Sequence, residues 1–329
     1  MGVKRDRNST TELILNTPVA LFFYNRPDLL NLVINQISKI AIPKLFLISD
    51  GAIYQNKGDD LKVQQCRKLC EKITCADQII KIYRDSNVGL YRNITEGIKH
   101  VFSETDTCIF LEDDTLPDLS FFSFCQEILG HYKNEERILL VQGVNLINSS
   151  AVEGVGNSSF FFTEYAGIWG WASWRHKWNK YYSADIDPKI SLKKSRSYKG
   201  SFRSKRELVY WAEKWESLKT QKSTWDAQVT FAMKRHGLLS VVPIKNLVKN
   251  VGFGHKDATH TINYSKQHDL SMESLTFPLR YPKIVSSNEF YDKNISLTKV
   301  PRLSKRVLDG ISYRIKLLRC VFNEKNTRF

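Results

Sequence analysis

The first 145 residues alternate between short apolar runs and longer segments with apolar residues at helical spacing. The runs have the length of buried strands, and they occupy residues 18–24, 44–48, 79–83, 108–111 and 138–142. Between them, apolar residues recur three and four positions apart, which predicts helices around residues 28–40, 59–74, 94–102 and 121–132. Such strand–helix repeats predict an α/β fold with a mostly parallel central sheet flanked by helices.

The pattern changes at both ends of this region, which divides the chain into four parts. Residues 1–17 are polar and are expected to be a disordered N-terminus. Residues 18–145 carry the strand–helix repeats. Residues 146–290 continue the same domain with a short aromatic strand, two helices, a further strand and a loop dense in Gly and His. Residues 291–329 are expected to form a basic amphipathic C-terminal segment.

Three carboxylates in a row, Glu112-Asp113-Asp114, follow the fourth predicted strand. In an open α/β sheet, ligands bind beyond the carboxyl ends of the strands. Adjacent acids repel one another, and a hard cation such as Mg²⁺ or Mn²⁺ would relieve the repulsion and could in turn hold a diphosphate. The alternative is a solvated acidic turn. The position of the acids at the end of a buried strand favours a ligand site.

Two more charged residues follow sheet strands and should lie on the same rim. Arg26 comes after the first strand and could meet a phosphate, because a guanidinium suits phosphate geometry. Asp50 comes after the second strand and could accept hydrogen bonds from a nucleobase or a ribose. The alternative for Asp50-Gly51 is a plain turn.

The second half of the chain offers three further candidates. Trp171 belongs to a cluster of three tryptophans, whose rings could stack on a sugar or a base, or could pack in a core. Asp226 begins a predicted helix and could act as a general base, although a capping box with Ser223 would also explain it. His255, or His260 in the same loop, could complete a metal or diphosphate site.

Several classes of protein are excluded by motifs and composition. The glycine-rich dinucleotide fingerprint and the P-loop pattern are absent, which argues against a dehydrogenase and a P-loop NTPase. The apolar runs are too short to span a bilayer or to serve as a signal peptide, so we expect a cytoplasmic protein. The six cysteines lack the spacing of a zinc site and are expected to be reduced thiols.

The net charge of +15 is concentrated in two segments. Residues 189–222 hold eleven Lys or Arg and three acids, and residues 292–329 hold ten and three, so the rest of the chain is neutral. A nucleic-acid-binding protein could carry such charge. So could a protein that docks on anionic lipid or handles phosphorylated substrates. Because no recognition motif accompanies the charge, we expect no nucleic-acid partner.

The order of the motifs resembles that of the GT-A-type (Rossmann-like) nucleotide-diphospho-sugar glycosyltransferases. The sequence is similar to the Golgi N-acetylglucosaminyltransferase that begins complex N-glycans and to bacterial surface-polysaccharide sugar transferases. The resemblance spans residues 18–262, at low overall identity. The matching motifs are, in order, Tyr24-Asn25-Arg26-Pro27, Ser49-Asp50-Gly51, Leu111-Glu112-Asp113-Asp114, Gly170-Trp171 and Trp225-Asp226.

This resemblance implies a nucleotide-diphosphate sugar as donor, with a UDP-sugar as the first choice. Residues 18–145 would form the nucleotide-sugar-binding half, and residues 146–290 the acceptor and catalytic half. Asp114 and His255 would ligate Mn²⁺ or Mg²⁺. The residues expected to contact the donor are Arg26, Asp50, Arg92, Glu112, Asp113 and Trp171.

The resemblance also implies an inverting transfer in which Asp226 is the catalytic base. The Golgi enzyme has a second Asp after this position, where the present chain has Ala227. The histidine with which that enzyme reads uracil is replaced here by Arg92 or Asn93, so the nucleobase is not identified.

Residues 303–321 combine an apolar stripe with flanking lysines and arginines. This is typical of a helix that lies on an anionic membrane surface, and a helix packed on the domain is the alternative. A glycan or lipid-linked glycan acceptor would be found at such a surface. We therefore expect a cytoplasmic enzyme, peripheral on the inner face of the plasma membrane, in O-antigen, capsule or lipopolysaccharide synthesis. The competing hypothesis is a non-catalytic nucleotide- or glycan-binding protein of the same fold.

Overall fold

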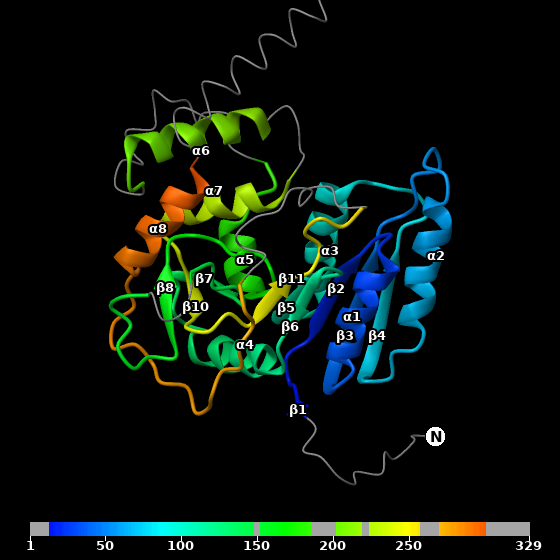
Figure 1. The fold of residues 1–329 in the computed structure, drawn as a ribbon, viewed down its shortest axis with the longest axis horizontal. Helices are drawn as coiled ribbons and strands as arrows, with labels where there is room; N and C mark the ends of the chain where they lie inside the picture. The colour runs from blue at the N-terminus through cyan, green and yellow to red at the C-terminus, as the bar shows by residue number, and fades with distance from the viewer. Residues whose placement is uncertain (1–12, 148–151, 186–201, 219–223, 257–269, 301–329) are drawn as a thin grey trace, which may run out of the picture.

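The computed structural model describes residues 13–147, 152–185, 202–218, 224–256 and 270–300, and a single large sheet runs through them. In Figure 1 the sheet extends from β4 at the right to β8 at the left. Its strands are β1 (Leu13–Ile14), β2 (Val19–Phe23), β3 (Ile40–Ser49), β4 (Ala76–Tyr83), β5 (Thr107–Glu112), β7 (Ile138–Gln142), β8 (Phe160–Thr163), β9 (Trp171–Trp174) and β10 (Leu239–Pro243).

The sheet is mostly parallel, as the strand–helix pattern predicts. The strands pair in the order β1-β3-β2-β5-β9-β7-β10-β8, and β4 pairs with β3. The strands β2 to β5 run parallel, β9 is antiparallel to both β5 and β7, and β8 is antiparallel to β10. The predicted α/β class is therefore confirmed, and the arrangement is consistent with a GT-A or Rossmann-like fold.

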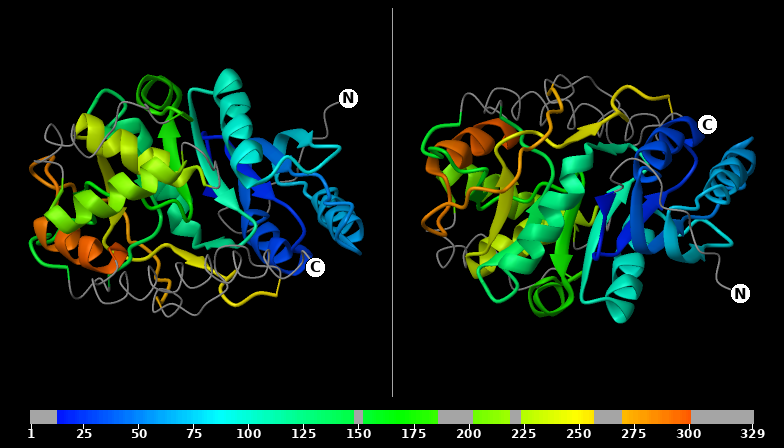
Figure 2. Two further views of the ribbon diagram at one scale, coloured as in Figure 1. Left: turned by 90° about the horizontal axis from the view of Figure 1, so that it is seen from above. Right: turned by 90° about the horizontal axis from the view of Figure 1, so that it is seen from below.

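Helices cover both faces of the sheet (Figure 2). One apolar core lies under α1, α2 and α4, and a second lies under α3, α5 and α7. At the β8 end, α6 and α8 lie close to α7 (Figure 1). The helices are α1 (Pro27–Ile37), α2 (Asp59–Cys70), α3 (Leu90–Glu104), α4 (Leu119–His131), α5 (Arg175–Tyr181), α6 (Lys205–Leu218), α7 (Asp226–His236) and α8 (Glu289–Lys299).

A second, two-stranded sheet follows the acidic motif. It pairs β6 (Thr115–Pro117) with β11 (Val248–Asn250). This pairing fixes the loop after β11 beside the motif, since the Val251 amide donates to the Asp114 carbonyl at 2.8 Å.

The expectation of a disordered segment up to residue 17 is wrong for residues 13–17. Leu13–Ile14 forms β1, which pairs with the start of β3, and the Leu15 side chain is buried. Strands β1 and β2 pair with successive parts of β3. The sequence did not predict β1, because the three apolar residues Leu13, Ile14 and Leu15 follow a long polar stretch.

The expected domain boundary at residue 291 also needs correction. Helix α8 crosses it, and Tyr291 and Ile295 are buried against Phe161 and Val242. The segment 303–321 lies outside the described residues. Within the described ranges, no helix is both long and apolar enough to cross a bilayer.

Candidate functional site

A cavity of about 460 Å³ opens at the carboxyl ends of β2, β3, β4 and β5. Because the strands lie in the order β4-β3-β2-β5, the two ends of the cavity are lined by different kinds of residue. Residues after β3 and β4 supply apolar groups and side-chain amides, and residues at the end of β5 supply acids. The lining residues discussed below are Tyr24, Asn25, Arg26, Asp50, Ile53, Leu90, Asn93, Glu112, Asp113 and Lys256.

At the charged end, Arg26 bridges two of the three acids. Its Nη1 donates to Asp114 Oδ2 at 2.8 Å, and its Nη2 forms an ion pair with Asp113 Oδ1. Burial alone would lower the pKa of the guanidinium, but the Asp113 and Asp114 charges raise it. The acidic motif is therefore a buried ion-pair cluster, and Arg26 lies with its predicted partners on the rim.

Glu112 is the third acid; the Arg26 charge acts on it, but it makes no ion pair within the described residues. Burial, together with the Asp114 and Asp113 charges, raises the pKa of Glu112 to about 8. Asp226 also raises it, which places the Asp226 carboxylate within electrostatic range of this end of the cavity. Asp226, from the second half of the chain, therefore lies near enough to act on the acidic motif, although it does not itself line the cavity.

Aromatic stacking connects the two halves at this point. Phe110, two residues before Glu112, stacks on Trp171 at 4.2 Å between ring centroids. Trp171 in turn packs against Trp225, next to Asp226, at 5.5 Å. Trp171 is only 2% exposed and does not line the cavity. The expectation that its ring contacts the donor is therefore wrong; it belongs to the core that positions Asp226.

Asp226 begins α7, and one of its oxygens is already held. The Thr224 hydroxyl donates to Asp226 Oδ1. The described residues give the other oxygen, Oδ2, no hydrogen-bond partner. The capping box with Ser223 falls outside the described residues, and the α7 N-terminus has no side-chain cap among the residues that are described.

Asp50 lies at the other end of the cavity, and most of its hydrogen-bond acceptor positions are used by backbone amides. It accepts hydrogen bonds from the backbone N–H groups of Gly51, Val88 and Gly89, at 2.8, 2.9 and 3.0 Å. These contacts tie the loop after β3 to the loop before α3. Asp50 therefore shapes the cavity wall, and a carboxylate can accept about four hydrogen bonds, which leaves it one acceptor position for a ligand.

Asn93, and not Arg92, faces the cavity from α3. Arg92 is 64% exposed and pairs with Glu96, and it is absent from the lining. Asn93 lines the cavity and is buried, and its Oδ1 has no hydrogen-bond partner among the described residues. Arg92 thus lies outside the cavity lining, and a contact between Arg92 and the donor stays a prediction. The sequence could have indicated that Asn93 points inward, because it lies four residues before Gly97 on the buried face of the helix.

Two residues of the cavity wall were missed by sequence reasoning. Asp59, at the start of α2, accepts hydrogen bonds from Tyr24 Oη, Asn25 Nδ2 and the Ile53 amide, and so holds three lining residues together. Lys256 is a second cation in the lining besides Arg26, and the described residues give it no acidic partner.

The metal ligands expected from the sequence are not brought together. His255 Nε2 lies 3.0 Å from Asp28 Oδ2 at the start of α1, and Asp114 is held by Arg26. In the described part of the chain, no three His, Cys, Asp or Glu side chains are arranged to hold a metal ion. The described cysteines are buried free thiols.

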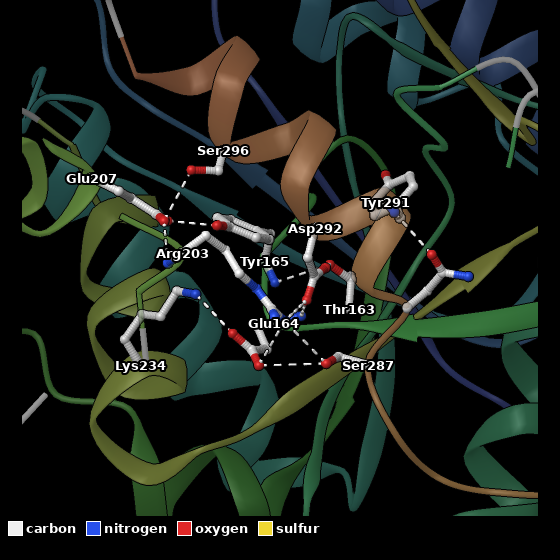
Figure 3. A network of polar contacts seen from close by, with 11 residues as sticks. Thr163, Glu164, Tyr165, Arg203, Glu207, Lys234, Ser287, Tyr291, Asp292 and Ser296 are labelled. Carbon is white, nitrogen blue, oxygen red and sulfur yellow. Dashed lines mark hydrogen bonds and ion pairs between the residues drawn. The ribbon is translucent and has the colours of Figure 1, made fainter. Parts of the chain in front are cut away.

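A second charged cluster lies away from the cavity, between β8, α6, α7 and α8 (Figure 3). Arg203 donates to Glu164 and Asp292 at 3.1 and 2.9 Å, and Lys234 donates to Glu164 at 3.1 Å. Glu207 is fully buried and accepts from Tyr165, Ser296 and the Arg203 amide. These contacts fasten α6 and α8 to the sheet.

Comparisons with known proteins give a broad structural likeness only. No protein-family model matches the chain, and no curated protein matches it. Among solved structures, it is similar to a mannosyltransferase from Pyrobaculum calidifontis in complex with GDP-Man and Mn²⁺, with 9% identity over 67% of this chain and 70% of that one and a TM-score of 0.36.

Two further similar structures are a UDP-glucose pyrophosphorylase and mouse xyloside xylosyltransferase 1. The first has 10% identity over 72% of this chain and 93% of that one, with a TM-score of 0.34. The second has 9% identity over 68% and 83%, with a TM-score of 0.32. At such low identities and scores, these proteins carry no inference about the activity of the present chain.

Proposed function

We propose that this chain is a glycosyltransferase that moves a sugar from a nucleotide-diphosphate donor to a hydroxyl group of a glycan acceptor. The observation that supports the proposal is one arrangement of residues. A cavity at the carboxyl ends of four strands joins an amide-lined end to a charged end, and the Asp226 carboxylate lies within electrostatic range of the charged end.

The two ends of the cavity suit the two ends of such a donor. A nucleobase has an apolar face and hydrogen-bonding edges, which match Ile53, Leu90 and the amide of Asn93. The diphosphate needs positive charge, and Arg26 and Lys256 line the charged end. We therefore orient the donor with its base toward β4 and its sugar toward Glu112 and Asp226.

The transfer step is a single displacement. The acceptor oxygen forms a bond to the anomeric carbon as the bond from that carbon to the diphosphate oxygen breaks, and Asp226 takes the acceptor proton. Thr224 holds Asp226 Oδ1, which leaves Oδ2 for the proton. One displacement inverts the anomeric configuration, so we propose an inverting enzyme.

The chain's own residues do not fit the Mn²⁺ or Mg²⁺ expected from the sequence. Asp113 and Asp114 are bridged by Arg26, and His255 pairs with Asp28. No step of the proposed reaction passes through a metal ion.

The narrower parts of the proposal come from the sequence resemblance. They are a UDP-sugar donor, a glycan or lipid-linked glycan acceptor and a role in bacterial surface-polysaccharide synthesis. A further part, a peripheral position at the inner face of the plasma membrane, comes instead from the apolar stripe and flanking basic residues of the segment 303–321. Removing the chain after Val300 should then move the protein from the membrane fraction to the soluble fraction, and an unchanged distribution would contradict the membrane part.

Nucleotide release from a donor panel tests the main proposal. The purified chain would be incubated with UDP-, GDP-, dTDP- and CDP-sugars, with and without glycan acceptors. We expect one nucleotide class to be released, faster when the right acceptor is present. Binding of a nucleotide with no release under any condition would favour the competing hypothesis of a non-catalytic binding protein.

A further inference from the structure

The acidic motif at the end of β5 already has a counter-ion. Arg26 contacts both oxygens of Asp113, through Nη2 and, at 3.4 Å, through Nε, and it contacts Asp114 Oδ2 through Nη1. A guanidinium held by two carboxylates in this forked manner is a strong, geometrically specific pair. Asp113 also accepts from the Tyr24 amide at 3.3 Å. Both of its oxygens are therefore engaged by protein groups.

The remaining side of Asp114 is closed by backbone. A Cβ atom added to Gly252 would lie 2.4 Å from Asp114 Oδ2 and 3.0 Å from Arg26 Nη1. The loop after β11 is fixed there by the amide of Val251, which donates to the Asp114 carbonyl, and by Asn250 Oδ1, which accepts from the Gly252 amide. Asp114 is buried and does not line the cavity. A divalent ion bound at Asp114 Oδ2 would have to displace both Arg26 and this loop.

The positive charge that faces the cavity is supplied by Lys256. Of the two cations in the lining, Arg26 is engaged by carboxylates, and Lys256 has no acidic partner among the described residues. An ammonium group on a flexible stem can move to a phosphate without breaking an existing ion pair.

We propose that Arg26 is the permanent counter-ion of Asp113 and Asp114, and that the chain binds nucleoside diphosphates without a divalent cation, with Lys256 meeting the diphosphate. This inference rests on the proposed function, because it concerns the same cavity. It departs from the expectation that carboxylates at the end of this strand would hold a metal ion.

Calorimetric titration of the full-length wild-type protein tests the inference without any variant. UDP, GDP, CDP and ADP would each be titrated in EDTA, in MnCl₂ and in MgCl₂ at matched ionic strength. We expect the best-bound nucleotide to have the same Kd in all three buffers, to within about threefold. A Kd in EDTA more than about a hundredfold weaker than in MnCl₂ would overturn the inference and leave the proposed function standing.

Absence of binding by every nucleotide in every buffer would overturn the proposed function, and this inference with it. Mn²⁺ binding to the wild-type protein alone, followed by the loss of the free-ion electron spin resonance signal, gives an independent reading. We expect the free-ion signal to persist, and stoichiometric tight binding would overturn the inference.

The role of Lys256 is tested by Lys256→Gln. We expect its nucleotide Kd in EDTA to rise about tenfold or more, because a charge-assisted hydrogen bond to the diphosphate is lost. Lys249→Gln is the matched control, since Lys249 lies on the neighbouring strand β11 and does not line the cavity. Equal affinities for Lys256→Gln and the wild type would remove Lys256 from the proposal.

Discussion

Two clusters in this molecule place one arginine between two carboxylates, and they differ in what surrounds them. Arg26 joins Asp113 and Asp114 at the edge of a cavity, beside a third acid, Glu112, that makes no ion pair in the described ranges. Arg203 joins Glu164 and Asp292 between the sheet and three helices, where a further cation and several hydroxyl groups complete the set (Figure 3).

The difference shows how the same residue types can serve two purposes. At Arg203, Thr163 and Ser287 supply hydroxyl groups near the carboxylates, and Lys234 provides a second cation for Glu164. A buried polar network that is satisfied in this way specifies how elements pack. At Arg26, the neighbouring carboxyl group of Glu112 lines an open cavity and makes no ion pair or hydrogen bond with a side chain of the described residues. A carboxyl group in a cleft with a strongly raised pKa is an arrangement associated with functional sites.

The largest expected effect is a loss of catalytic rate, without a loss of binding or stability, at the cavity. Asp226→Asn should lower kcat by about a thousandfold, because a general base contributes roughly 10²–10⁴ to the rate. The Kd for the donor nucleotide and the Tm should stay unchanged, since the amide has the same shape. Stopped-flow or coupled measurements of nucleotide release provide the rate. A variant that keeps a tenth of the wild-type rate would show that Asp226 is not the base.

The next effect is a loss of stability in the cluster around Arg203. Glu207→Ala should lower the free energy of unfolding by about 3 kcal/mol, because the buried Tyr165 and Ser296 hydroxyl groups lose their acceptor. Urea denaturation measures this loss. Nucleotide binding should be unaffected. Glu216→Ala, on the exposed side of α6, is the control and should leave the stability unchanged. An equal loss of stability in both variants would show that the buried contacts of Glu207 do not stabilise the fold.

A smaller effect tests the wall of the cavity. Asp59→Asn should weaken nucleotide binding about tenfold, because the amide cannot accept from Tyr24, Asn25 and the Ile53 amide together. Asp60→Asn, an exposed neighbour on α2, should bind as the wild type does. Calorimetry on both variants makes the comparison, and equal affinities would show that Asp59 does not organise the wall.

The last effect is a pH dependence of stability. The native pKa of Glu112 is raised from 4.5 to about 8. A carboxyl group that holds its proton more tightly in the native state stabilises the fold at low pH and loses this contribution as the pH rises toward the native pKa. Replacing it by Gln removes the titration.

The stability of Glu112→Gln relative to the wild type should therefore rise by about 3 kcal/mol between about pH 5 and about pH 8. Urea denaturation at several pH values measures this difference. A difference that is constant across this range would show that the Glu112 carboxyl titrates normally.

The elements of the first half could be predicted because each depends on a local pattern. The strand at residues 138–142 has the predicted bounds, and the helix expected at 121–132 is α4 at Leu119–His131. The grouping of Arg26, Asp50, Glu112 and Asp113 at one rim also followed, since parallel strands place their carboxyl ends together.

Other features could not be predicted, because they depend on residues far apart in the chain. The ion pair between Arg26 and Asp113 joins positions 87 residues apart, and no periodicity reports it. The burial of Trp171 follows from the insertion of β9 between β5 and β7. From the sequence alone, the Trp171 ring could equally stack on a ligand or pack in a core. The pairing of β9 with β5 and β7 buries it in the core.

Strand β9 has a consequence for how the chain acquires its shape. It pairs with β5 through Ile109↔Ala172 and with β7 through Val141↔Ala172, so a single short strand closes the gap between segments made much earlier in synthesis. A nascent chain that ends before residue 174 presents two open sheet edges, which favour association with other chains. The edge of β5 therefore stays without its β9 partner until residues 171–174 have been made, and pairings between residues so distant in sequence slow folding.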